Sequence, residues 1–92
     1  MEQHTDHLAF LTPSNRAKTV AHFSRAIELT VLAGRASARG DKKLYDEHLS
    51  SVHKQNIGAM RAVLPELQGA NHLRCVRTIE NLQQTLAAGI KS

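Results

Sequence analysis

The chain has 92 residues and one cysteine, so it suits a single domain and cannot close an internal disulfide. Twelve Lys and Arg against eight Asp and Glu give a net charge of +4, with +2 in residues 1–46 and +2 in residues 47–92, which excludes a basic tail. The N-terminus lacks a secretory signal pattern, and the longest apolar stretch, Ala26 to Gly34, is far shorter than the ~20 residues that span a bilayer. We therefore expect a cytoplasmic protein without a membrane segment.

The first part of the chain predicts an arm followed by a long helix. Residues 1–12 are expected to form a short helix or an arm. Thr12 before Pro13 is a helix-start signal, because a threonine hydroxyl can cap the first turn and proline is tolerated there, so we predict a helix over 13–39. Gly40 suits a left-handed C-terminal cap. Four apolar residues recur at helical spacing in this segment: Val20, Phe23, Ile27 and Val31.

Two further helices are predicted after the turn at Gly40. Asp41 can cap a helix over 41–64, and Pro65 ends it because proline lacks a backbone donor and restricts the residue before it. Residues 65–71 are the connector, and Asn71 is the expected cap of a last helix over 71–90. Short turns favour antiparallel neighbours. We therefore predict an all-α fold, a small antiparallel three-helix bundle with a short N-terminal helix or arm, in one domain over 1–92.

One region carries more apolar surface than a single buried face requires. Between Ala26 and Ala38 the apolar residues extend well past half a turn, so this half of the helix is either the bundle centre or also a contact surface. We take the second reading as the leading hypothesis. It predicts a non-enzymatic helical interaction module that regulates, inhibits or escorts a partner protein, or pairs with a second copy as a homodimer. The expected contact residues are Ile27, Val31, Leu32 and Gly34, with Arg35 and Arg39 at the polar rim.

The histidines and the cysteine do not form a recognisable chemical site. His48 and His53 are five positions apart, which splays their rings about 140° apart on a helix. His72 and Cys75 are three apart and could share a zinc ion, but two further ligands would be needed. Cys75 lies on an apolar helix face, where an inert thiol is the rule. We expect no enzyme activity, no metal, no cofactor and no small-molecule substrate.

The alternative hypothesis is a small basic nucleic-acid-binding regulator. Residues 64–79 loosely resemble a helix-turn-helix, with Gly69 at the turn and Arg74 and Arg77 available for contact. A second basic cluster lies at the first turn between helices and includes Lys42 and Lys43, whose side chains could meet phosphates.

Overall fold

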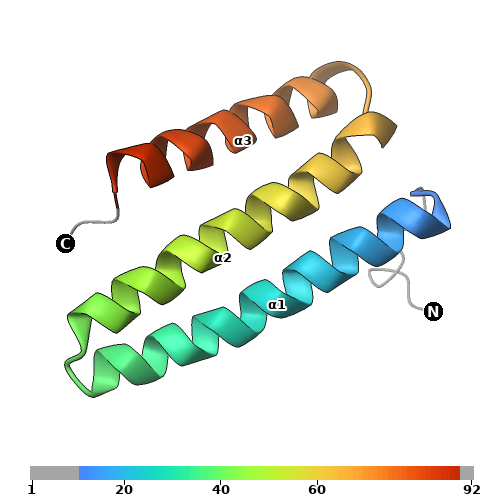
Figure 1. Ribbon diagram of the computed structural model, residues 1–92. Coiled ribbons are helices and arrows are strands. Elements are labelled where there is room, and N and C mark those ends of the chain that lie inside the picture. Colours follow the sequence, from blue (N-terminus) through green and yellow to red (C-terminus); the bar gives the residue numbers. More distant parts are fainter. Residues whose placement is uncertain (1–10, 90–92) are drawn as a thin grey trace.

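The computed structural model describes residues 11–89, and this part of the chain is helical with no strand. The elements are α1 (Pro13–Ala38), α2 (Lys42–Val63), the short 3-10 helix η2 (Leu64–Glu66) and α3 (Gly69–Ala88). The predicted all-α, three-helix architecture is confirmed (Figure 1). Of the expected arm over residues 1–12, only Leu11 and Thr12 are among the described residues.

Local capping interactions set the ends of α1 and the start of α2. The Thr12 hydroxyl accepts a hydrogen bond from the Asn15 amide at 3.3 Å, with Pro13 at the first helical position. At the turn, Gly40 takes a left-handed φ of 74°, a conformation that glycine adopts without steric cost. The Asp41 carboxylate then accepts from the Leu44 amide at 3.1 Å and caps α2. These are the caps that the sequence predicts.

The start of α3 differs from the expectation at Asn71. The helix begins at Gly69, and Gln68 occupies the N-cap position in extended conformation without a side-chain cap bond. Gly69 has a φ of 60°, and this left-handed geometry turns the chain from the connector into the helix two residues early. Asn71 therefore lies inside the first turn of α3. The helix ends at Ala88, before the expected residue 90.

The three helices lie side by side in one layer, with α2 in the middle (Figure 1). Helix α1 packs along most of its length on α2, α3 packs on the opposite side of α2 over a smaller area, and the described parts of α1 and α3 do not meet. The radius of gyration is 14.9 Å, above the roughly 12 Å expected for a compact domain of this length. An open layer leaves the outer edge of α1 without a neighbouring helix among the described residues.

Small side chains hold α1 close against α2. The buried residues of α1 are Thr19 and, at alternating three- and four-residue spacing, Ala26, Leu29, Ala33 and Ala36. His22 falls on the same line and its Nδ1 lies 2.8 Å from Oε1 of Gln55. At Gly58 an added Cβ would lie only 2.7 Å from the His22 ring. The two backbones can approach this closely because glycine and alanine occupy the contact line.

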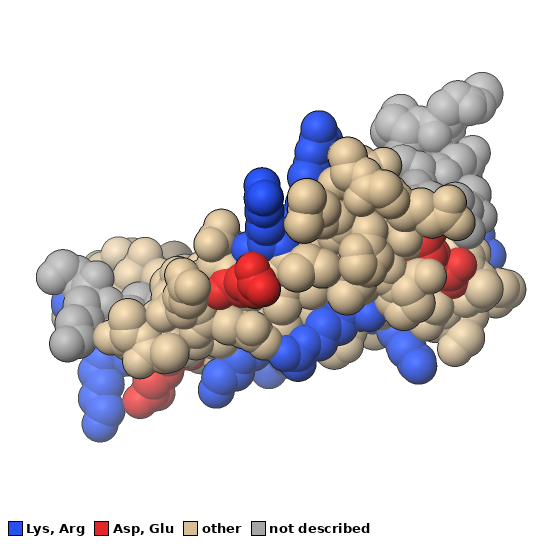
Figure 2. Space-filling view, turned by 90° about the horizontal axis from the view of Figure 1, so that it is seen from above, with Lys and Arg blue, Asp and Glu red and all other residues tan. Residues whose placement is uncertain are grey.

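The middle helix presents one polar broad face and one apolar broad face. Between Leu44 and Val63, the strongly exposed side chains are Glu47, Lys54 and Arg61, which follow each other at seven-residue steps. Figure 2 shows Lys and Arg side chains gathered in a row along the lower edge of the molecule, which corresponds to the front of Figure 1. The opposite positions of α2 include Ala59, which is fully buried, and Val52 and Val63, which are half-buried.

The contact between α2 and α3 is a conventional amphipathic one. On the inner face of α3, Ile79 is buried and Cys75, Val76, Leu82 and Leu86 are half-buried. Cys75 donates from Sγ to the carbonyl oxygen of Met60 at 3.5 Å, which places it against α2. No helix within residues 11–89 combines the length and the apolar character needed to cross a membrane.

Candidate protein-interaction surface

Helix α1 has a second apolar line opposite its buried one. We call it the outer stripe and define it as the four large apolar residues that α1 leaves exposed: Val20, Phe23, Ile27 and Val31. Ile27 is 67% exposed, Val31 50%, Val20 47% and Phe23 38%. A surface helix normally has one apolar line. Helix α1 therefore carries large apolar side chains that its packing against α2 leaves exposed.

The outer stripe has the spacing of a helix-docking surface. Its members are three or four residues apart, so at about 100° per residue they form one nearly straight line along the helix. From Val20 to Val31 the line runs for about 16 Å at 1.5 Å per residue. Amphipathic helices recognise partners through anchors at this same spacing.

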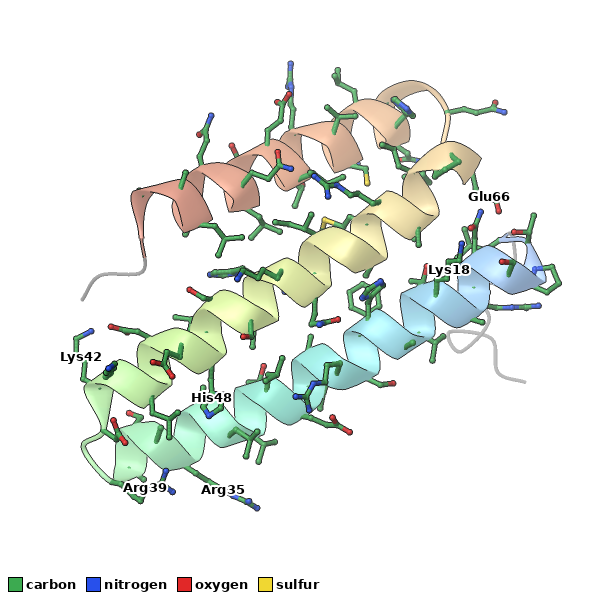
Figure 3. The ribbon with its side chains drawn as sticks, in the orientation of Figure 1. Lys18, Arg35, Arg39, Lys42, His48 and Glu66 are labelled. Carbon is green, nitrogen blue, oxygen red and sulfur yellow. The ribbon has the colours of Figure 1, made fainter. Side chains whose placement is uncertain are left out.

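The predicted contact residues distribute over the outer stripe and its flanks. Ile27 and Val31 belong to the stripe, and Gly34 continues its line as an exposed position where an added Cβ would meet no other group within 4 Å. Leu32 is half-buried and lies about 100° around the helix from Val31. Arg35 and Arg39 are exposed and project from α1 near the turn (Figure 3). They stand at one end of the stripe and are not spread around it.

Val20 and Phe23 were not among the predicted contact residues. The sequence pattern indicates that they share a helical line with Ile27 and Val31, and that signal was sufficient to group all four. The line that actually faces α2 consists mostly of smaller residues, which leaves the larger ones exposed.

Glu66, the last residue of η2, is hydrogen-bonded to the start of α1. Its Oε2 accepts hydrogen bonds from the Thr12 amide and from Nδ2 of Asn15, both at 2.9 Å. The bond from the Thr12 backbone, followed by that from Asn15, lowers the pKa of the Glu66 carboxyl below its ordinary value of 4.5. Figure 3 shows Glu66 next to the first turn of α1. The anchor fixes the end of α1 from which the outer stripe begins.

The histidines and the cysteine of the described residues are not arranged for metal binding or nucleophilic chemistry. His22 is engaged with Gln55 in the contact between α1 and α2. Burial raises the pKa of the Cys75 thiol, which disfavours the thiolate that a nucleophile or a zinc ligand requires. His72, one turn earlier, is exposed. No group of three or more His, Cys, Asp or Glu side chains within residues 11–89 is arranged to hold a metal ion.

Two surface hollows lie near the first turn. The larger of these two, of about 590 Å³, is open and lined by Lys42, Lys43, Asp46, Glu47 and Ser50. Lys42 Nζ is paired with Oδ2 of Asp46 at 2.7 Å in this region. The lining offers charge but no nucleophile paired with a histidine base, one of the arrangements that activate a nucleophile for covalent catalysis.

The two basic clusters of the nucleic-acid hypothesis lie apart. Arg74 and Arg77 are in the first half of α3 and exposed, whereas Lys42 and Lys43 begin α2 at the other end of the layer (Figure 1). In the region that resembles a helix-turn-helix, the element immediately before Gly69 is the single 3-10 turn η2 and a two-residue link. The structure does not bring the two clusters into one surface.

Comparison of the chain with family models, with curated proteins and with solved structures found no match.

Proposed function

We propose that this protein is a small non-enzymatic interaction module that binds a helix of a partner protein through the outer stripe of α1, and thereby regulates, inhibits or escorts that partner. The observation that carries the proposal is the exposure of Ile27, at 67%, in the middle of a continuous apolar line. The partner helix is contributed by another protein or by a second copy of the chain.

The layered architecture supports this use of α1. Since α3 packs on α2 and the described parts of α1 and α3 do not meet, the outer edge of α1 is left for an additional helix. A helix placed there would extend the row by one member without rearranging the other three. Gly34 leaves room for close approach near the turn, and Arg35 supplies a charged group at the border of the contact.

The exposed apolar surface sets the scale of the interaction. The unburied fractions of the four stripe residues amount to about two whole side chains. Fully burying one such side chain contributes about 1.5 to 3 kcal/mol, so the stripe can contribute about 3 to 6 kcal/mol. Association itself costs about 4 kcal/mol or more, so the partner must also contact the flanks of α1 to bind tightly.

A charge-insertion pair tests the proposal. Ile27→Glu combined with Val31→Glu places two carboxylates on the stripe, and Gln84→Glu combined with Ala88→Glu makes the same charge change at the same spacing on exposed positions of α3. Loss of Ile27 burial alone is worth about 1 to 2 kcal/mol, so the stripe variant should bind at least about tenfold more weakly.

Two readouts complete the test. Sedimentation velocity over a concentration series measures self-association, and quantitative affinity capture measures binding to a second protein. The proposal requires that the stripe variant loses association while keeping its helical circular dichroism, and that the α3 variant behaves as wild type. It is wrong if the stripe variant unfolds, or if both variants associate equally.

A further inference from the structure

A different surface of the molecule concentrates positive charge across the contact between α1 and α2. We define the basic face as Lys18 and Arg25 of α1 together with Lys43, Lys54 and Arg61 of α2, all of which are exposed. It occupies one broad side of the layer, and Figure 2 shows a row of Lys and Arg side chains along the edge that corresponds to the front of Figure 1. The outer stripe is on the edge of the layer, so the two surfaces are distinct.

Helix pairing places like charges opposite each other on this face. His22 meets Gln55 and Gly58, which fixes the antiparallel register of α1 against α2. In an antiparallel pair, a step back along α1 corresponds to an equal step forward along α2. Lys18, four residues before His22, therefore lies opposite residues 59–62, which include Arg61. Arg25, three residues after His22, lies opposite residues 52–55, which include Lys54. The register therefore places two pairs of cations at matching positions along the helices, Lys18 with Arg61 and Arg25 with Lys54.

The two pairs lie on the same broad side of the layer. Lys18 and Arg25 are seven residues apart, as are Lys54 and Arg61, so each helix repeats its cation after two turns, about 10 Å. Figure 3 shows Lys18 on the side of α1 that faces α2. The acidic residues near this face are Glu28, whose Oε1 pairs with Arg25 Nη1 at 3.0 Å, and Asp46 and Glu47, which line one hollow with Lys43. Five basic against three acidic groups leave the face positive.

Like charges opposite each other destabilise a helix pair, and Glu28 already offsets the charge of Arg25. We propose that the remaining positive charge of the basic face binds the phosphate backbone of a nucleic acid without sequence preference. A continuous polyanion fits a face whose cations repeat along two parallel rows, because DNA offers a phosphate charge about every 1.7 Å of its axis and each row finds phosphates in any register. Docking on a lipid surface uses large apolar side chains beside the cations, and Leu32, next to this face, is half-buried.

Fluorescence anisotropy with a labelled duplex and a labelled single strand tests the proposal. For four neutralised phosphates, duplex affinity should fall about 150-fold between about 50 and 200 mM salt. Lys54→Ala with Arg61→Ala should reduce the slope of log affinity against log salt by about one per residue. Arg74→Ala with Arg77→Ala removes the same charge from the outside of α3 and should leave the slope close to that of wild type.

Several outcomes would overturn the proposal. Absence of binding at about 50 mM salt is one. If Arg74→Ala with Arg77→Ala reduces the slope of log affinity against log salt, and Lys54→Ala with Arg61→Ala does not, the nucleic acid binds at Arg74 and Arg77 instead. Equal displacement of the labelled duplex by polyglutamate and by unlabelled duplex at matched charge would show attraction to any acidic chain. Stronger binding to phosphatidylserine vesicles than to either nucleic acid would identify a membrane surface.

Discussion

The close contact between α1 and α2 predicts opposite effects for the two glycine positions inside helices. Gly58→Ala adds a methyl group 2.7 to 2.9 Å from three atoms of the His22 ring, whereas the same change at Gly34 meets nothing within 4 Å. Both substitutions gain about 1 kcal/mol of helix propensity. Overpacking at Gly58 costs about 1 to 3 kcal/mol, and the His22 ring cannot move freely because it is bonded to Gln55.

The propensity gain cancels between the two variants, so their difference isolates the contact. Gly34→Ala should stabilise the chain by about 0.5 to 1 kcal/mol, and Gly58→Ala should be less stable than Gly34→Ala by about 1 to 3 kcal/mol. For a domain of this size the difference corresponds to at least about 4 °C in Tm. Urea unfolding followed by circular dichroism measures it, provided that the m value is unchanged.

A His22→Ala background provides the control for this prediction. Removing the ring should remove most of the penalty at Gly58, so that Gly58→Ala becomes nearly neutral or stabilising in the double variant. The reasoning about close packing fails if Gly58→Ala stabilises the wild-type chain as much as Gly34→Ala does. It also fails if the His22→Ala background leaves the penalty intact.

Three further predictions concern the turn, the anchor and the thiol. Asp41→Ala removes the cap of α2 and should cost about 1 kcal/mol, seen as a fall in Tm by circular dichroism; an unchanged Tm would mean that the cap is not used. Since hydrogen bonding lowers the folded-state pKa of Glu66, this carboxylate stabilises the fold above its unfolded pKa, and that stability is lost as pH falls through its folded pKa. Glu66→Gln should therefore lower Tm at neutral pH, and the gap to wild type should close well below pH 4.5; a gap independent of pH would contradict this. Cys75, whose pKa burial raises, should react with iodoacetamide more slowly in the native protein than in urea at the same neutral pH, and equal rates would refute its burial against α2.

The helices could be predicted from the sequence because their ends depend on neighbouring residues. Thr12 with Pro13, and Asp41 after Gly40, act within one turn of the chain, so their effect is visible without the fold. The start of α3 was missed because the left-handed geometry of Gly69 redirects the chain before Asn71. A glycine permits that geometry but does not require it.

The orientation of α1 could not be predicted from hydrophobicity. Both the outer stripe and the buried line have helical spacing, and the stripe has the larger side chains. The buried line faces α2 because most of its residues, such as Ala33 and Ala36, are small, and because Gly58 of α2 leaves room for the His22 ring on the same line. That match depends on residues more than 20 positions apart in the sequence. The positions of the cations on the basic face follow from the same register. They could not be predicted either, because the register depends on residues far apart in the sequence.

Site-specific photo-crosslinking tests the central claim, that the outer stripe of α1 binds a partner helix. A benzophenone amino acid replaces Ile27 in one variant and Gln84, an exposed residue of α3, in the other. Irradiation in native cell extract should give a discrete crosslinked product from position 27 and none from position 84. A product of twice the chain mass would identify a second copy, and any other mass a different protein. No product at position 27, or the same product from both positions, would contradict the account.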